Sequence, residues 1–303
     1  MNESLPYELA SGQTRVILLD KDIFRLHMIN EIDVLSRDPS LGDMIKLAIV
    51  DGNVEDLLSH SYEDLADIGT YLNDLLDHNT QQSWSPIMTL HEFTRCRGRD
   101  MSRDIVLPII KREEERIVLT NIALFHDDEM VGQASPREGF FLKSLRGEPT
   151  AYQYETTIKK ENLNKSGMNK FLENESTDQD VKVVMKIIKN KAKVKLINPH
   201  NIEFNVGINM DIDIQEISEP YQFDKPEAVV AIKKQLDIEL SNQLQEFLNK
   251  LKAVNSDCIG FKEVYRSQVS QAQLKSTNWS SVFPSFTIHG NVKIRVIRTG
   301  TLE

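Results

Sequence analysis

One amphipathic stripe near the carboxyl end of this 303-residue chain most strongly limits how the sequence can fold. Between residues 226 and 251, apolar side chains recur every three or four positions, namely Val229, Ile232, Leu236, Leu240, Leu244, Leu248 and Leu251. This spacing places them along one side of a single α-helix. Pro226 and Glu227 suit the first turn of that helix. Burying seven such side chains gives on the order of 10–20 kcal/mol before chain entropy is subtracted, so we expect the helix to pack on a sheet.

Segments of alternating apolar and polar residues predict that sheet. The alternation is nearly regular in Val181–Ile188 and Lys193–Leu196 and strict in Phe204–Ile214, and Phe286–Arg298 supplies a closing strand after the helix. Alternation is typical of strands with one buried and one solvent-exposed face, which are usually antiparallel. Asp211 and Asp213 lie two residues apart, so we expect both on the solvent-exposed face. No second set of ligands accompanies them, and we interpret them as surface residues rather than an acid–base or metal pair.

The first eighty residues show a different order of elements. Arg15–Leu19 and Met44–Val50 resemble buried strands, and residues 22–35 and 51–78 have helical patterns. Strand–helix–strand–helix order favours parallel pairing of the strands. Residues 79–86 are polar and are predicted to form a linker.

The middle of the chain predicts a short helix and a pair of strands. The helix covers Thr89–Cys96, and the strands Asp104–Ile110 and Arg116–Phe125 are joined by a charged turn. A second turn at His126–Glu129 leads to Met130–Gly132, after which Ser135 and Pro136 suit the start of a helix. The polar segment 159–180 has no periodicity and is predicted to be a mobile loop.

These patterns together predict an α+β protein of several domains, with mixed or antiparallel sheets each packed against helices. We expect three sections: residues 1–80 as the remainder of an N-terminal α/β domain, 81–158 as a middle α+β domain, and 159–303 as a C-terminal domain. The last section would hold a mainly antiparallel sheet, the long helix 226–251 and the closing strand. Its aromatic residues Trp279, Phe283 and Phe286 fit the end of a helix–sheet core better than an exposed partner site. Gly260 and Gly300 are expected in turns.

Composition excludes several classes of protein. A net charge of −10 argues against a nucleic-acid groove or a polybasic membrane patch. No run of about eighteen apolar residues occurs, and the polar start Met1–Pro6 does not resemble a signal peptide. Cys96 and Cys258 are too far apart in sequence for a CxxC unit, and we interpret both as packing residues. Whether the two cysteines pair is left open.

The sequence shows no catalytic constellation. His91-Glu92 begins like the zinc motif HExxH, but Arg95 occupies the position of the second histidine. The acidic turn Asp127–Glu129 lacks the ligand spacing and the glycine of a calcium loop. No GxSxG elbow, phosphate-binding loop or GxGxxG motif occurs. We therefore predict a protein that is not an enzyme, with no catalytic, cofactor-binding or metal-binding residues.

Several spaced motifs in one order resemble the Ger(x)C family, the C subunits of bacterial spore germinant receptors. The matching positions are Arg37-Asp38-Pro39, Val106-Leu107-Pro108-Ile109, Ala123–Gly132 with its ALFxxxxxVG form, Asp257 with Gly260, Phe283-Pro284 and Arg298-Thr299-Gly300. They extend across nearly the whole chain, and together they are much more specific than any one of them. Family members look longer at the amino end, where they begin with a lipid-modified cysteine. This sequence has no such cysteine, so we expect a chain that starts inside domain one. Trimming, an N-terminal truncation or a mis-called start would each produce this, and we favour trimming.

The resemblance implies a non-catalytic receptor subunit without cofactors. It would be a lipoprotein on the outer face of the spore inner membrane, held there by an N-terminal lipid anchor absent from this chain. There it would act with the membrane-embedded A and B subunits in germination signalling in response to nutrients, with no nucleic-acid partner. The alternative is an extracytoplasmic small-molecule binding protein that captures the germinant itself. A cell-surface hydrolase is a third hypothesis, for which no nucleophile–base pair is visible.

Overall fold

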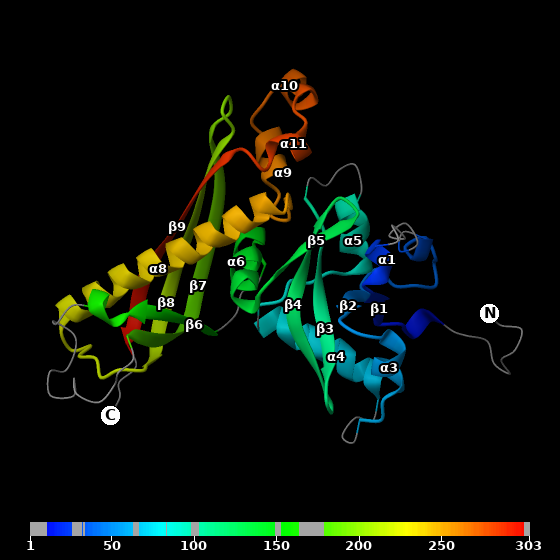
Figure 1. Ribbon diagram of the computed structural model, residues 1–303, viewed down its shortest axis with the longest axis horizontal. Helices are drawn as coiled ribbons and strands as arrows, with labels where there is room; N and C mark the ends of the chain where they lie inside the picture. The colour runs from blue at the N-terminus through cyan, green and yellow to red at the C-terminus, as the bar shows by residue number, and fades with distance from the viewer. Residues whose placement is uncertain are drawn as a thin grey trace, which may run out of the picture. The chain divides into compact units, whose positions relative to one another are not determined.

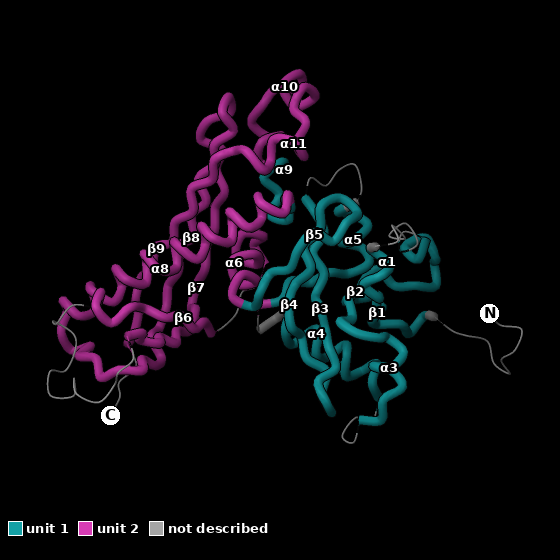
Figure 2. Tube along the Cα trace, viewed as in Figure 1, with its two compact units in different colours: residues 1–80, 85–136, 256–263 teal, residues 81–84, 137–255, 264–303 magenta. Residues whose placement is uncertain are grey.

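The chain divides into two compact units, which Figure 2 shows in different colours. The computed structural model describes residues 11–25, 32, 34–62, 67–82, 84–97, 103–148, 153–163 and 179–299. Unit 1 comprises residues 1–80, 85–136 and 256–263, and unit 2 comprises residues 81–84, 137–255 and 264–303. The three sections expected from the sequence, 1–80, 81–158 and 159–303, stay a prediction.

Unit 1 contains a five-stranded sheet in the order β1-β2-β3-β4-β5 (Figure 1). Its strands are β1 (Val16–Asp20), β2 (Lys46–Val50), β3 (Val106–Glu113), β4 (Arg116–His126) and β5 (Glu129–Ala134). The first three strands pair in parallel, which confirms the pairing predicted for β1 and β2. β3, β4 and β5 form antiparallel hairpins at the two predicted turns. The sheet therefore joins strands from both sides of residue 80.

Helices and one short 3₁₀ turn surround this sheet. They are η1 (Ser11–Gln13), α1 (Asp22–Arg25), α3 (Val54–Ser59), α4 (Ile68–Gln82) and α5 (Leu90–Arg97). One cluster of the core joins α3 and α4 to strands, and it contains Ala48, Val50, Leu57, Tyr62, Leu72, Leu76, Ile110 and Ile117. Most of the helix predicted after residue 25 lies outside the described residues.

The predicted linker 79–86 is wrong at its start, because α4 continues to Gln82. Asn79 donates a side-chain hydrogen bond to the carbonyl oxygen of Leu75 at 2.8 Å. Its neighbours Leu72 and Leu76 are buried and hold this face of the helix in the core. Tertiary packing thus extends the helix through polar residues that have no strong helical signal of their own.

Unit 2 contains a four-stranded sheet in the order β6-β7-β8-β9. Its strands are β6 (Gln153–Lys159), β7 (Asp180–Asn198), β8 (Glu203–Ile217) and β9 (Thr287–Thr299). The first three strands pair antiparallel, and β9 pairs with β8 in parallel. The sheet is therefore mainly antiparallel, as predicted, although β6 was not among the predicted strands. Of the predicted loop 159–180, residues 164–178 lie outside the described residues.

Two details of the predicted strands are wrong. Val181–Ile188 and Lys193–Leu196 belong to one continuous strand, β7, because Lys189 and Lys191 between them remain paired with β8. A bulge at Ile188 interrupts the alternation that the sequence analysis relied on. Asp213 was expected to be exposed like Asp211, but it is buried, with only 9% of it exposed. Both neighbouring strands bulge beside it, β7 at Ile188 and β9 at Ile297, while β8 itself keeps its alternation.

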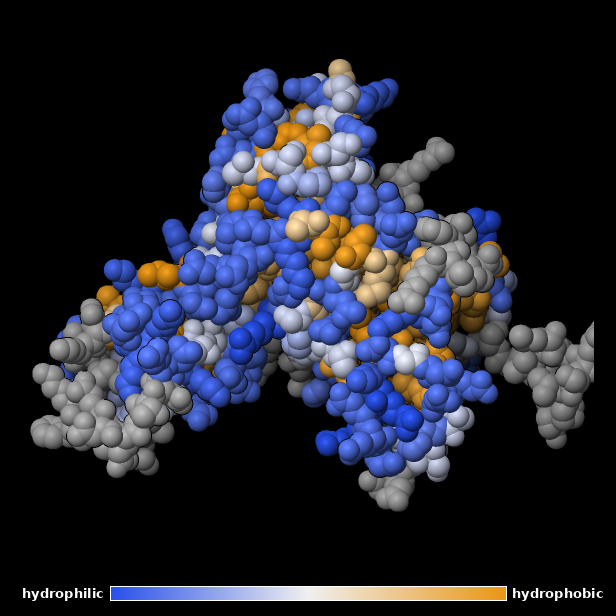
Figure 3. Space-filling view, in the orientation of Figure 1, coloured by the Kyte–Doolittle hydropathy of each residue, from blue (hydrophilic) through white to orange (hydrophobic). Residues whose placement is uncertain are grey.

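The predicted long helix is α8 (Pro226–Ala253), which crosses one face of this sheet (Figure 1). Six residues of the stripe are completely buried, namely Ile232, Leu236, Leu240, Leu244, Leu248 and Leu251. Val229 is half-buried, and Ala228 and Phe247 join the buried side instead. Figure 3 shows mainly hydrophilic residues over the side of α8 that faces the viewer. The amphipathic stripe therefore forms the core of unit 2, as its spacing predicts.

Polar side chains of α8 bond to the outer edge of β9. Asp237 Oδ1 accepts the Ile294 N–H at 2.6 Å, and Ser241 Oγ accepts the Val292 N–H at 2.9 Å. Gln245 accepts the Gly290 N–H at 2.8 Å and donates to the Ile288 carbonyl at 3.1 Å. The bonding residues of α8 are four positions apart, a rise of about 6 Å, and their partners in β9 are two positions apart, a rise of about 6.6 Å. These nearly equal spacings allow each helical side chain to reach the next free backbone group of the strand.

The remaining helices of the described chain are short. They are α6 (Pro136–Arg146), η2 (Lys160–Leu163), α9 (Phe261–Arg266), α10 (Gln271–Ser276) and α11 (Trp279–Val282). Trp279, Phe283 and Phe286 form one aromatic cluster with ring centroids 5.0–6.2 Å apart. Phe283 and Phe286 are buried, which confirms the predicted core role. Among the described residues, no helix is both long and apolar enough to cross a membrane.

Gly290 allows α8 to lie close to β9, and we predict that a side chain there destabilises unit 2. A Cβ atom at this position would lie 3.0 Å from Leu248 Cδ1 and 3.2 Å from Leu244 Cγ. Gly290→Val should lower the free energy of unfolding by about 1–3 kcal/mol, because it overpacks a complete core. Urea unfolding followed by circular dichroism measures this change.

Gly207→Val is the matched control, because Gly207 lies in the neighbouring strand on the opposite, solvent-exposed face. The atom nearest to a Cβ at this position is Asn291 Oδ1, at an ordinary contact distance of 3.5 Å. Its effect should stay within about 0.5 kcal/mol. Equal losses in the two variants would contradict the close-packing role of Gly290.

Candidate functional site

The carboxylate of Asp257 organises the start of α9. Its Oδ1 accepts the N–H groups of Gly260 at 2.9 Å and Phe261 at 2.7 Å, and its Oδ2 accepts the Lys262 N–H at 2.8 Å. Gly260 has φ +94°, a backbone conformation that favours glycine, so its predicted turn is confirmed. The other predicted turn glycine, Gly300, lies outside the described residues.

Asp104 binds the same segment from the start of β3. Its Oδ2 accepts the Asp257 N–H at 2.7 Å, and its own N–H donates to the Asp257 carbonyl at 3.1 Å. We call Asp104 and Asp257 the carboxylate junction. It lies within unit 1 and joins residues that are 153 positions apart in the sequence. No local pattern distinguishes Asp104 from other aspartates, so the sequence analysis missed it.

Burial dominates the electrostatics of the carboxylate junction. The pKa of Asp257 is raised to about 7, mainly by loss of water and also by the Asp104 carboxylate, against the lowering effect of the N–H donors of Lys262, Phe261 and Gly260. Burial also raises the pKa of Asp104, against the lowering effects of the Asp257 N–H and of His126. Two buried carboxyl groups thus hold protons more strongly than exposed ones do.

His126 and Asp127 lie beside Asp104 at the predicted β4–β5 turn. One ligand atom from each of the three side chains can be chosen so that all lie within 4.8 Å of one another. His126 Nδ1 is 3.8 Å from Asp104 Oδ2, and His126 Nε2 is 3.9 Å from Asp127 Oδ2. Both Asp104 oxygens already accept backbone N–H groups, from Asp257 and Asp127. Imidazole and carboxylate can bind a divalent ion, but the expectation of no metal site stays a prediction.

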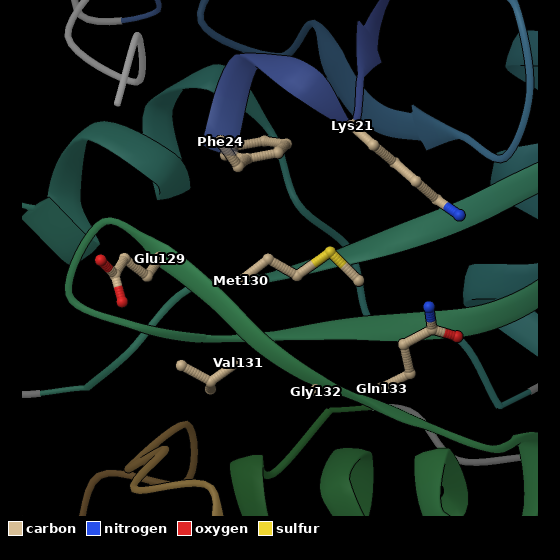
Figure 4. Close-up of a pocket in the computed structure, with 7 residues that line it drawn as sticks. All are labelled: Lys21, Phe24, Glu129, Met130, Val131, Gly132 and Gln133. Atoms are coloured by element: carbon tan, nitrogen blue, oxygen red, sulfur yellow. The ribbon is translucent and has the colours of Figure 1, made fainter. Parts of the chain in front are cut away.

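A cavity of about 520 Å³ lies on unit 1, lined by Lys21, Phe24 and residues 129–133 of β5. Figure 4 shows Lys21 and Phe24 on one side, facing the strand that bears Met130 and Gln133 on the other. The Phe24 ring packs edge-on against Phe125 at 4.8 Å, and Lys21 pairs with Asp51. The volume is within the range of small-molecule sites, and charged, amide and apolar groups line it.

The other residues considered in the sequence analysis do not form a reactive site together. Cys96 and Cys258 are both buried, and the described structure contains no disulfide between them. Glu92, from the incomplete HExxH motif, forms ion pairs with Arg103 and with Arg95, the latter at 3.5 Å. Arg95 is thus a structural partner of Glu92 at the position where the motif needs a histidine.

Comparisons with known proteins identify the class of this chain as a spore germination protein. The model of the family described as "Spore germination protein N-terminal domain" matches residues 1–112. The model described as "Spore germination B3/ GerAC like, C-terminal" matches residues 120–300, more than half of the chain. The chain belongs to the Ger(x)C family of spore germination proteins, as its motifs indicated.

Two relatives support this assignment. The spore germination protein GerQC of Bacillus cereus is 25% identical over 299 residues, which are 98% of this chain and 77% of the relative. The crystal structure of the GerBC protein matches with a TM-score of 0.61 at 15% identity, over 97% of this chain and 82% of that chain. The second match concerns the fold alone, and it confirms the predicted α+β class with sheets packed against helices.

The raised pKa of Asp257 predicts that stability falls as pH increases. From about pH 4 to about pH 7, the folded chain keeps this proton whereas the unfolded chain releases it. The folded state therefore binds more protons, and the free energy of unfolding should fall by up to about 1.4 kcal/mol per pH unit. Asp257→Asn should flatten this slope. Urea unfolding at several values between pH 5 and pH 8 measures it.

Asp67→Asn is the control for this prediction. Asp67 also accepts N–H groups at the start of a helix, from Gly69 and Thr70, but it is exposed and those bonds lower its pKa. It is ionised throughout the measured range in both states, so its substitution should leave the slope unchanged. Parallel curves for the unsubstituted chain and Asp257→Asn would contradict the assignment.

Proposed function

We propose that this chain is the non-catalytic C subunit of a spore nutrient-germinant receptor. The observation that carries the proposal is family membership over both halves, at residues 1–112 and 120–300, in the order of the family's domains. A relative that matches 98% of the chain at 25% identity is itself called a spore germination protein. Relatives of this family have a role in germination, and their family is not a known enzyme family.

In this proposal the subunit acts with the membrane A and B subunits to trigger germination. A lipid anchor at the amino end of the full-length lipoprotein holds it on the outer face of the spore inner membrane. The two α+β units offer preformed surfaces, and binding to one conformational state of the partners stabilises that state. The subunit needs no cofactor and no nucleic acid for this role.

Spores that lack the gene test the proposal. They should lose the response to nutrients, measured as dipicolinic acid release, and keep the response to a trigger that bypasses receptors. The lipoprotein should also co-purify with its A and B subunits in gentle detergent. Unchanged nutrient responses together with a failure to co-purify would contradict the receptor role.

A second candidate function is direct capture of a small-molecule germinant. The cavity between Lys21, Phe24 and β5 supports it, since its volume of about 520 Å³ suits a small molecule with charged groups. Lys21 and Glu129 could bind an anionic and a cationic group, and Phe24 and Met130 offer apolar contact. This function would make the subunit a sensor in addition to a docking component.

A thermal-shift series with nutrient germinants tests this second function. A ligand at one hundred times its Kd stabilises the folded protein by about 2.7 kcal/mol, or about 5–10 °C in a unit of this size. Met130→Trp should abolish the shift by filling the cavity, whereas Ile87→Trp, at an exposed position outside it, should not. A shift that survives Met130→Trp would exclude this cavity as the site.

A further inference from the structure

The solvent-exposed face of the unit 2 sheet contains ordered rows of basic residues. Strand register places one residue each of β7, β8 and β9 side by side in every row. The four rows are Lys189–Asp211–Arg295, Lys191–Asn209–Lys293, Lys193–Gly207–Asn291 and Lys195–Asn205–His289. Residues opposite one another in a sheet point to the same side, so these side chains share one face.

This face is the one that α8 does not cover. Val206, Ile208 and Met210 of β8 are buried on the α8 side, and the residues between them therefore point away from the helix. The lysines of the four rows and Arg295 are exposed. We call this surface the basic face.

The basic face is positive although the whole chain has a net charge of −10. Its rows contain six Lys or Arg residues and one acidic residue, Asp211. Arg295 binds both oxygens of Asp211, at 2.9 and 2.6 Å, and so neutralises it. Opposite Lys191, Lys193 and Lys195 stand only Asn209, Gly207 and Asn205, and over the described ranges these three lysines form no ion pair. The net charge of the whole chain therefore does not describe the local charge of this surface.

The arrangement of these charges favours a broad anionic surface as the partner. Four rows at about 6.7 Å per two residues extend over about 20 Å along the strands. Lysine is a flexible point charge that fits many phosphate groups without a fixed geometry. The rows contain no aromatic residue, whereas sequence-tolerant binding of single-stranded nucleic acid relies on aromatic stacking.

We propose that the basic face of β7, β8 and β9 binds the headgroups of an anionic lipid bilayer. The inference goes beyond the proposed lipid anchor, since it assigns a second membrane contact to residues of this chain. Such a contact orients unit 2 with α8 directed away from the bilayer. Surface charges of this kind act over about one Debye length, so the contact weakens with salt.

Vesicle co-sedimentation of the 303-residue chain tests the proposal. The chain should bind vesicles of phosphatidylglycerol and phosphatidylcholine, should not bind phosphatidylcholine alone, and should be released as salt rises from about 0.05 to about 0.5 M. Replacing Lys191, Lys193 and Lys195 together by Glu should weaken binding at least about tenfold. A variant with Gln at the same three positions should give an intermediate loss, and circular dichroism checks that both variants fold.

The matched control replaces three exposed lysines elsewhere by Glu, namely Lys111, Lys234 and Lys275. This control variant changes the net charge by the same amount as the triple Glu variant of the basic face, and it should still bind the anionic vesicles. An equal loss in this control, or equal binding to both kinds of vesicle, would overturn the proposal. Binding to duplex DNA or to polyglutamate without binding to the vesicles would also overturn it. The assay uses neither a lipid anchor nor the A and B subunits, so its outcome is independent of the co-purification result.

Discussion

The hydrogen bonds between Asp104 and the backbone of Asp257 hold together a unit that the chain builds from separated segments. Unit 1 takes residues 256–263 from far along the sequence, and its other described residues end at Pro136. The carboxylate and the N–H of Asp104 fix this segment, and three N–H groups within it compensate for burying the Asp257 carboxyl group. A fragment restricted to residues 1–112 would lack both Asp257 and strands β4 and β5. The conserved-domain match at the amino end is thus shorter than the structural unit.

Much of the fold could be predicted from the sequence, because an element with one buried side has apolar residues at regular intervals. The leucine stripe of α8 and the alternation in β8 each have one strong periodicity, and both elements form where expected. Polar residues obscure the signal elsewhere. α4 runs through Asn79–Gln82 and β7 runs through Lys189–Ala192, because neighbouring elements supply the packing and the hydrogen bonds that local propensity does not.

The candidate sites depend on pairings that no local pattern contains. Asp104 contacts Asp257, which is 153 positions further along the sequence. The cavity is lined both by Phe24, which follows the first strand of the sheet, and by β5, the last strand in the sheet order. The basic face requires the register of three strands, of which one follows α8. The net charge is a sum over the whole chain, so a chain of net charge −10 can have a surface that is locally positive. The burial of Asp213 was likewise missed, because alternation gives the side of a strand on which a residue lies but not what covers that side.

The bonds from Asp237, Ser241 and Gln245 to β9 have a consequence for assembly. An uncovered outer strand is a template on which another chain can add a strand, whether in a specific complex or in an amyloid fibre. In β9, a helix occupies the place of that next strand and uses the same donors and acceptors. Sheet extension in unit 2 is therefore left to the opposite side of the sheet, where β6 offers seven residues and β7 continues beyond β6 from Ile187 to Asn198. A chain that adds a strand to this sheet would therefore pair with β6 or with the second half of β7, whereas partners of β9 would recognise its side chains.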